Sequence, residues 1–155
     1  MNYFYCPKCD GLYDGDWMLD DHNKRGSDRW YKWCPKAGCC GKAFQIDESM
    51  ILPIRRLNAK GYKTRFSCAG HIKGTGGYIG FDPEYAPSTS PKGWKYEEPT
   101  DGYLLCIRYS FKDNMNDLAK YKMIQTKINS LIKWSYELPP CEVKEENNVD
   151  VQTKA

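Results

Sequence analysis

Four cysteines near the start of the chain occur in two short segments of nearly the same sequence. Residues 6–11 read Cys-Pro-Lys-Cys-Asp-Gly, and residues 34–41 read Cys-Pro-Lys-Ala-Gly-Cys-Cys-Gly. Two thiolates this close in sequence reach one ion only if the backbone turns sharply between them, and proline after the first cysteine favours such a turn. The two knuckles therefore predict a chain folded around a metal ion.

Alignment of the two knuckles selects the ligands. Both segments end in Cys-x-Gly, so Cys39 takes the place of Cys9, and Cys40 becomes a spare thiol. We expect Gly11 and Gly41 to supply a positive φ where the chain leaves the metal, because glycine adopts that conformation without steric cost. The predicted metal ligands are Cys6, Cys9, Cys34 and Cys39.

Four thiolates without a histidine suit a closed, tetrahedral site, for which one structural Zn²⁺ is the expected ion. Iron in a rubredoxin-like site uses the same ligand set and is the main alternative, and a pair of disulfides is another. Residues 1–5 do not resemble a secretory signal, so we expect a reducing cytoplasm. In that compartment the eight cysteines are metal ligands and spare thiols.

Length and charge bound the class of protein. A chain of 155 residues can hold one moderate core and a small appended module. No apolar run reaches the roughly 20 residues of a membrane span, so we expect a soluble protein with no membrane partner. The net charge of +3 is small, but residues 49–81 contain only basic charged side chains. This segregation favours a basic face for phosphate groups; the alternative is a solvated face balanced by acids elsewhere in the fold.

The predicted fold class is α+β, with an N-terminal zinc ribbon followed by a small antiparallel sheet packed against two helices. We place the ribbon at residues 1–45, the α+β domain at 46–140 and a disordered polar tail at 141–155. In the ribbon, aromatic segments flank a polar turn through residues 21–28, which predicts a hairpin, with His22 on the surface of the turn. The apolar and aromatic residues of these two segments are Leu12, Tyr13, Trp17, Met18, Trp30, Tyr31 and Trp33.

The α+β domain is predicted in the order helix, three strands, helix. The first helix starts at a cap by Asp47 or Ser49 and stops at Gly61. Strands are expected in 62–68, 78–81 and 103–111, and the proline-rich stretch 82–101 is expected to be a functional or mobile loop. The second helix runs from a cap at Asp113 or Asn114 to about Tyr136. Its apolar stripe is Leu118, Tyr121, Ile124, Ile128, Leu131 and Ser135, with Ile132 beside it.

The loop at residues 67–71, Ser-Cys-Ala-Gly-His, is the second place where chemistry is expected. In one interpretation Cys68 and His71 are a nucleophile and base, or two metal ligands, and neighbouring basic side chains lower the thiol pKa. In another, the loop glycines and Lys73 bind an anion. In the third, the small residues only form a tight turn, and His71 satisfies a buried hydrogen bond.

The leading functional prediction is a zinc protein that binds nucleic acid or another phosphate-bearing ligand through its basic domain. Bases would stack on Tyr85, Trp94 and Tyr96 of the adjacent loop. The candidate ligand-binding residues are Arg55, Arg56, Lys63, Arg65, Ser67, Gly70 and Lys73.

Two other classes stay open from the sequence. An enzyme would use Cys68 and His71, with the proline-rich loop as a lid. A regulator or inhibitor encoded by a phage or bacterium would bind a host protein through ribbon aromatics such as Trp17, Trp30 and Trp33.

The run 57–71, preceded by a cysteine knuckle and followed by Gly-Tyr-Ile-Gly-Phe at 77–81, resembles a family of small, uncharacterised bacterial and phage zinc-ribbon proteins. That resemblance implies a zinc ribbon and no particular activity. The turn is also similar to the Ser-Cys-Ser-Gly-Arg motif of the tRNA wybutosine-synthesis methyltransferase family, which it matches at Ser67, Cys68 and Gly70. It departs from that motif at Ala69 and His71, so the S-adenosylmethionine and tRNA functions of the family are not carried over.

Overall fold

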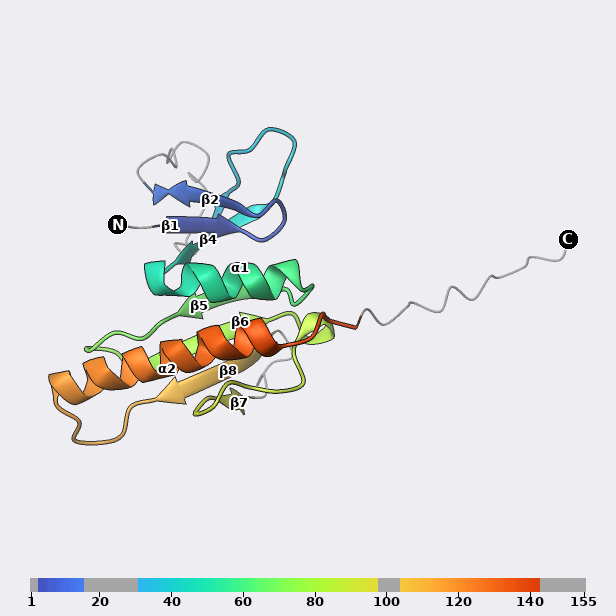
Figure 1. The fold of residues 1–155 in the computed structure, drawn as a ribbon. Coiled ribbons are helices and arrows are strands. Elements are labelled where there is room, and N and C mark those ends of the chain that lie inside the picture. Colours follow the sequence, from blue (N-terminus) through green and yellow to red (C-terminus); the bar gives the residue numbers. More distant parts are fainter. Residues whose placement is uncertain (1–2, 16–30, 98–103, 143–155) are drawn as a thin grey trace, which may run out of the picture.

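The computed structural model describes residues 3–15, 31–97 and 104–142, which form two four-stranded antiparallel sheets and two α-helices (Figure 1). The α+β class predicted from the sequence is confirmed. Several predictions lie outside the described residues: the polar turn at 21–28, the tail beyond residue 142, and the placements of Trp17, Met18, His22 and Trp30.

The first sheet has the strand order β2-β1-β4-β3. Its strands are β1 (Tyr3–Cys6), β2 (Gly11–Asp14), β3 (Tyr31–Trp33) and β4 (Lys42–Ile46). The predicted hairpin between the two aromatic segments is wrong, because β2 and β3 lie at opposite edges of this sheet. Each of them instead pairs with the strand on the other side of its own knuckle, with Cys6 opposite Gly11 and Trp33 opposite Lys42. The knuckles are the hairpin turns, which close much shorter loops than the predicted pairing.

The second sheet has the order β5-β6-β8-β7. It is built from β5 (Thr64–Cys68), β6 (Gly76–Phe81), β7 (Lys95–Glu97) and β8 (Leu105–Ser110). The three predicted strands correspond to β5, β6 and β8. The stretch predicted as a loop contains the 3₁₀ helix η4 (Pro83–Tyr85) and the strand β7, which pairs with β8 along its whole length.

The helices begin later than predicted. A 3₁₀ helix, η3 (Glu48–Met50), precedes α1 (Ile51–Ala59), and neither Asp47 nor Ser49 provides a side-chain cap to α1. The second helix, α2 (Asp117–Glu137), is capped by Asn116, whose side chain accepts a hydrogen bond from the Ala119 N–H. The predicted caps at Asp113 and Asn114 are therefore wrong; Asn114 has a φ of 64° and belongs to the turn before the helix.

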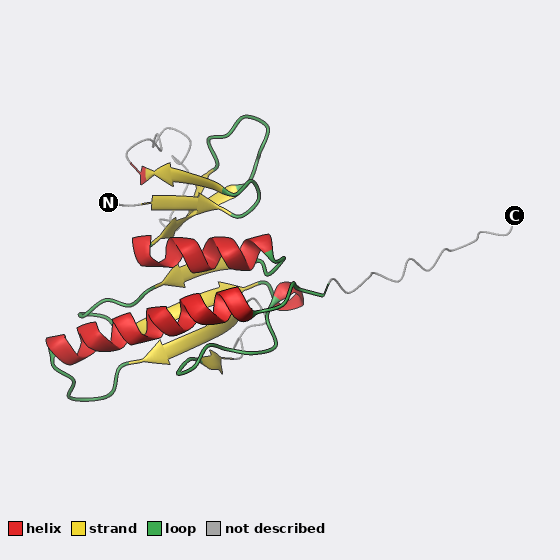
Figure 2. Ribbon diagram, in the orientation of Figure 1, coloured by secondary structure: helices red, strands yellow, loops and turns green. Residues whose placement is uncertain are grey.

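One apolar core joins both sheets and both helices; Figure 2 shows the ribbons of these elements coloured by secondary structure. Tyr5 and Ile46 of the first sheet belong to the same cluster as the residues of α1, β6, β8 and α2, so the predicted boundary after residue 45 is crossed by shared packing. On α2 the predicted stripe is only half correct. Ile128, Leu131 and Ser135 are buried, whereas Leu118 and Tyr121 are 61% and 53% exposed. Figure 1 shows the first turns of α2 extending past the end of β8.

Neither α1 nor α2, the helices of the described residues, is both long and apolar enough to cross a membrane.

Candidate metal centre and adjoining pockets

The two knuckles bring four sulfur atoms together. The Sγ atoms of Cys6, Cys9, Cys34 and Cys39 all lie within 4.8 Å of one another. Two pairs are closer, Cys6 with Cys39 at 3.7 Å and Cys9 with Cys34 at 3.6 Å. A metal–sulfur distance of about 2.3 Å gives a tetrahedron with edges of about 3.8 Å. A disulfide would need about 2.05 Å, and all eight cysteines are free. The disulfide alternative is therefore wrong, and this group can hold a metal ion.

The backbone of the two knuckles is closely similar. Asp10 and Cys40 occupy matching positions with φ values of 58° and 52°. The next residue in each knuckle donates its N–H to a cysteine sulfur, Gly11 to Cys9 and Gly41 to Cys39. The exposed Cys40 lies outside the sulfur cluster. The alignment of Cys39 with Cys9 thus corresponds to a shared backbone conformation.

The expected role of the knuckle glycines is wrong, since the positive φ belongs to the residue before each of them. Glycine is needed for close approach instead. A Cβ atom on Gly41 would lie 2.9 Å from Cys6 Sγ and 3.1 Å from Cys39 Sγ, and one on Gly11 would collide with the Tyr13 hydroxyl. These positions exclude a side chain because it would occupy the space of the sulfur atoms and their nearest neighbour.

The Tyr13 hydroxyl sits against the sulfur cluster, 3.4 Å from Cys34 Sγ and 3.7 Å from Cys9 Sγ. When thiolates bind a metal they carry no proton, so this hydroxyl is placed to donate a hydrogen bond to them. Sequence reasoning assigned Tyr13 only to a strand. The signal that points to it is its position on the strand that leaves the first knuckle, four residues after Cys9.

Replacing Tyr13 with phenylalanine is expected to lower the affinity for zinc by about 10-fold or more, because loss of a group that supports metal ligands typically costs 10–100-fold. A competition titration against a chromogenic chelator measures this affinity. The matched control is Tyr121→Phe, an exposed tyrosine on α2. Equal affinities of the two variants would contradict the proposed role of the Tyr13 hydroxyl.

The knuckle is fastened to α1 by a bidentate ion pair. Arg55 Nε and Nη2 donate to the Asp10 carboxylate at 3.0 Å and 2.6 Å, and the Tyr5 hydroxyl donates to Asp10 Oδ1 at 3.0 Å. The Arg55 hydrogen bonds hold the pKa of Asp10 below its usual range. Arg55 thus connects the two halves of the fold.

The remaining candidate ligand-binding residues do not form one face. Arg65 pairs with Asp82, and Arg56 lies over the Tyr136 ring at 5.3 Å. Lys63 and Arg65 line one pocket, whereas Ser67 lines another. Neither pocket is lined by Lys73.

Gly70 and the loop around it pack against Tyr109. Gly70 has a φ of 103°, and a Cβ there would collide with the Tyr109 hydroxyl, which donates to the Ala69 carbonyl. The Gly70 N–H donates to Cys68 Sγ at 3.4 Å, and the Gly74 N–H donates to the His71 carbonyl at 2.8 Å. These two amides are already partnered, so the loop supports a tight turn better than a phosphate cradle. The buried hydrogen bond expected for His71 is wrong, because His71 is exposed.

The aromatics of the proline-rich stretch are anchored in the fold. Trp94 is only 4% exposed, and its indole N–H donates to the Lys127 carbonyl of α2 at 3.1 Å. The Tyr96 hydroxyl donates to the carbonyl oxygens of Pro87 and Thr89. The prediction that Trp94 stacks on bases is therefore wrong, since its ring belongs to the core.

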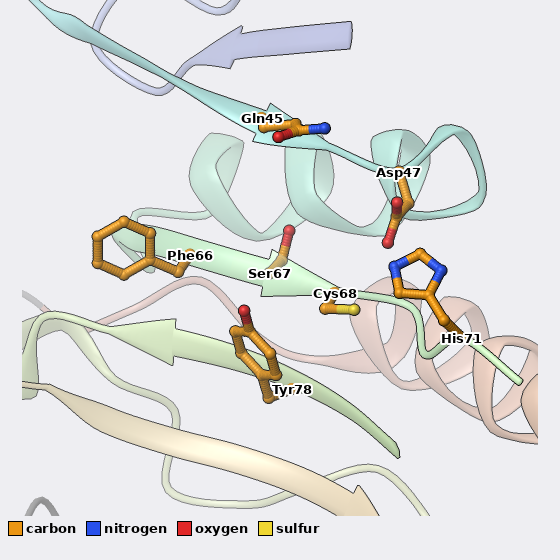
Figure 3. A pocket seen from close by; sticks show the side chains of 7 residues that line it. All are labelled: Gln45, Asp47, Phe66, Ser67, Cys68, His71 and Tyr78. Atoms are coloured by element: carbon orange, nitrogen blue, oxygen red, sulfur yellow. The ribbon is translucent and has the colours of Figure 1, made fainter. Parts of the chain in front are cut away.

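Cys68 and His71 lie beside a third polar side chain, Asp47 (Figure 3). A carboxylate oxygen, the thiol sulfur and an imidazole nitrogen of these residues all lie within 4.8 Å of one another. Asp47 follows β4, Cys68 ends β5, and His71 stands in the loop beyond. They line a pocket of about 340 Å³ together with Gln45, Phe66, Ser67 and Tyr78.

The expected activation of the Cys68 thiol is wrong. Burial raises its pKa, and the hydrogen bond from the Gly70 N–H only partly opposes this. The negative charge of Asp47 and a hydrogen bond with that carboxylate raise the pKa further. Without a bound cation, Cys68 is therefore a thiol at neutral pH and a poor nucleophile.

A second pocket, of about 560 Å³, lies where the first sheet meets β5 and the end of α1. Its wall includes one carboxylate, Asp82, which pairs with Arg65. Among the described residues of this wall, the other charged groups are three lysines, and Trp33 and Phe44 contribute two aromatic rings. We call this the cationic pocket and define it by Lys8, Trp33, Lys42, Phe44, Lys63, Arg65 and Asp82.

A comparison of the chain with protein-family models, with curated proteins and with solved structures finds no match.

Proposed function

We propose that this protein holds one structural Zn²⁺ in its four-cysteine centre and binds a phosphate-bearing ligand with a planar base in the cationic pocket. The ligand class is a nucleotide or a nucleotide unit of a single-stranded nucleic acid. The observation that carries the proposal is the combination, in one pocket, of three lysines with an exposed tryptophan.

Charge is the first argument. Arg65 and Asp82 neutralise each other through two hydrogen bonds of 3.1 Å and 3.0 Å. Lys42 and Lys63 lie over aromatic rings, Lys42 at 4.5 Å from the Tyr31 centroid and Lys63 at 3.8 Å from the Tyr85 centroid. These ring contacts leave each ammonium its positive charge, whereas an ion pair would neutralise it. Counted over the described residues that line it, the pocket therefore has a net positive charge that favours phosphate.

Shape is the second argument. Trp33 is 49% exposed although it lies on a strand, and its ring borders the cationic pocket. A base stacked on an exposed aromatic ring contributes about 1–3 kcal/mol to the binding free energy, whichever base it is. Lysines beside such a ring suit a ligand that carries a base and a phosphate together, so a free inorganic anion would use only part of this surface.

The metal serves this pocket as scaffold. Pro7, Lys8, Cys40 and Gly41 of the knuckles belong to its wall. A site with four cysteine ligands has no open position for substrate, so its contribution is to fix these residues in place. Zinc fits the role because it requires no redox chemistry and favours a tetrahedral site.

The test is fluorescence anisotropy with a fluorescein-labelled oligothymidylate, with ATP, unlabelled oligothymidylate and a matching DNA duplex as competitors. Lys42→Gln combined with Lys63→Gln is expected to reduce the slope of log K against log salt by about 1–2, because each lysine that contacts a phosphate releases close to one counterion. Trp33→Ala is expected to weaken binding by about 1–3 kcal/mol while leaving the salt slope unchanged.

The matched control replaces two exposed lysines of α2, Lys122→Gln with Lys133→Gln, which changes the net charge by the same amount. If the control loses as much salt dependence as the pocket variant, binding depends on overall charge alone, and the assignment of the cationic pocket as the binding site is wrong. Absence of salt-dependent binding by the unaltered protein also overturns the proposal. Competition by ATP indicates a nucleotide ligand, and competition by oligonucleotide only indicates a single strand.

A further inference from the structure

We propose that Asp47, Cys68 and His71 form a second zinc site, with a coordination position that opens into the pocket beside them. The site is independent of the cationic pocket, and its test does not depend on any nucleic-acid ligand. It also gives Cys68 a role that its protonated state does not exclude, because a metal ion displaces the thiol proton on binding.

The three donors converge from separate parts of the chain. Cys68 and His71 have the Cys-x-x-His spacing expected around a tight turn, and Asp47 comes from the end of β4 in the other sheet. Figure 3 shows the Asp47 carboxylate and the Cys68 sulfur both directed toward the imidazole ring. All three donor atoms already lie within 4.8 Å of one another.

The donor set fits zinc. Zinc accepts sulfur, nitrogen and carboxylate oxygen, at about 2.0–2.3 Å, which places the ligand atoms of a tetrahedral site about 3.3–3.8 Å apart. The three donor atoms lie within 4.8 Å of one another, so small side-chain rotations bring them to these distances. His71 is exposed, so its side chain can rotate inward without disturbing the core.

Two ligands are already held by backbone amides. The Ala69 N–H donates to Asp47 Oδ2 at 2.8 Å, and the Gly70 N–H donates to Cys68 Sγ at 3.4 Å. Hydrogen bonds of this kind orient metal ligands and support their charged form. The first bond also explains why the Asp47 side chain caps neither η3 nor α1, since its carboxylate is directed to the loop after β5.

Three protein ligands leave the fourth position of a tetrahedral ion free, an arrangement typical of zinc sites that carry water. The free side here is the pocket of about 340 Å³. Figure 3 shows the side chains of Gln45, Ser67 and Tyr78 around its interior. A zinc-bound water would therefore face polar groups, and the ion would be accessible to a small oxygen ligand from solvent.

The test counts metal ions in the full chain. Native mass spectrometry and elemental analysis of protein saturated with zinc, after removal of loosely bound ion, are expected to give two zinc ions per chain. His71→Ala is expected to give one, and so is Asp47→Asn, which keeps an oxygen to accept the Ala69 N–H but loses the charge. Cys68→Ser is expected to lose the same ion.

The controls use the same residue types. His22→Ala replaces the only other histidine in the sequence, and Cys40→Ser replaces an exposed cysteine outside the sulfur cluster; both are expected to retain two ions. His71 is exposed, so the His71→Ala variant is expected to stay folded. Its circular dichroism spectrum distinguishes loss of the second zinc ion from unfolding. One zinc ion in the unaltered protein, or two in His71→Ala, overturns the second site. Neither result bears on the cationic pocket, because oligonucleotide binding is measured separately.

Discussion

Cys39→Ser is expected to remove one metal ion and unfold the first sheet. Cys39 is only 6% exposed, and its sulfur belongs to a cluster with three other thiols. Structural zinc contributes an apparent binding free energy of about 10–16 kcal/mol at neutral pH in small zinc domains, as much as the whole stability of a typical domain. Metal content and hydrogen exchange in β1 and β4 measure the loss.

Cys40→Ser is the matched control, because it alters the adjacent cysteine of the same knuckle. Cys40 is exposed and lies outside the sulfur cluster, so this variant is expected to keep its metal and its hydrogen-exchange protection. Metal loss from Cys40→Ser with retention in Cys39→Ser would show that the fourth ligand has been misassigned. Retention of the metal and of the hydrogen-exchange protection by both variants would contradict the role of Cys39 as a required ligand.

Leu131→Ala is expected to lower the free energy of unfolding by about 2–5 kcal/mol, the cost of removing a fully buried leucine side chain and leaving a cavity. Leu131 is 0% exposed and belongs to the core that joins both sheets. Alanine favours the helix at least as well as leucine, so α2 itself is not weakened. Urea denaturation of the zinc-loaded protein measures the change.

Leu118→Ala makes the same chemical change on the same helix at a position that is 61% exposed. Its effect is expected to stay within about 0.5 kcal/mol, as for most surface substitutions. Similar losses in the two variants would contradict the burial of α2 described here, and would restore the continuous stripe that the sequence predicts.

The sequence pattern predicted the elements of the fold better than their partners. The grouping of Cys6, Cys9, Cys34 and Cys39 was predictable because the two knuckles have nearly the same sequence. Similar sequences adopt the same turn, and Asp10 and Cys40 have matching φ values. The pairing of β2 and β3 was not predictable from the aromatic segments alone. Each segment could pair across the polar turn or across its own knuckle, and the shorter loops determine the result.

The charge pattern misled for a related reason. Residues 49–81 contain no acid, but the fold brings carboxylates from other parts of the chain to two of their arginines. Arg55 pairs with Asp10, and Arg65 pairs with Asp82. Lys60 is used structurally, since its ammonium donates to the carbonyl oxygens of Ser135, Tyr136 and Leu138 at the end of α2. Linear charge density thus overstated the basic surface.

Asp47 was missed as a site residue because sequence reasoning assigned it to a helix cap. An aspartate before a helical pattern usually caps the helix. The local sequence does not distinguish such an aspartate from Asp47, whose carboxylate accepts a hydrogen bond from Ala69 in the loop after β5. Only the packing of β4 beside β5 brings Asp47 to Cys68. The sequence likewise does not distinguish Cys68 from Cys106. The fold does, because it places Asp47 and His71 beside Cys68.

β4 begins within three residues of Cys39 and ends one residue before Asp47. Its five residues form an extended segment of about 17 Å. A strand paired on both sides is stiff along its length, so it acts as a spacer of fixed length between the four-cysteine centre and the pocket lined by Asp47, Cys68 and His71. The separation between the second knuckle and the Asp47 carboxylate is therefore set by the backbone pairing of β4 with β1 and β3.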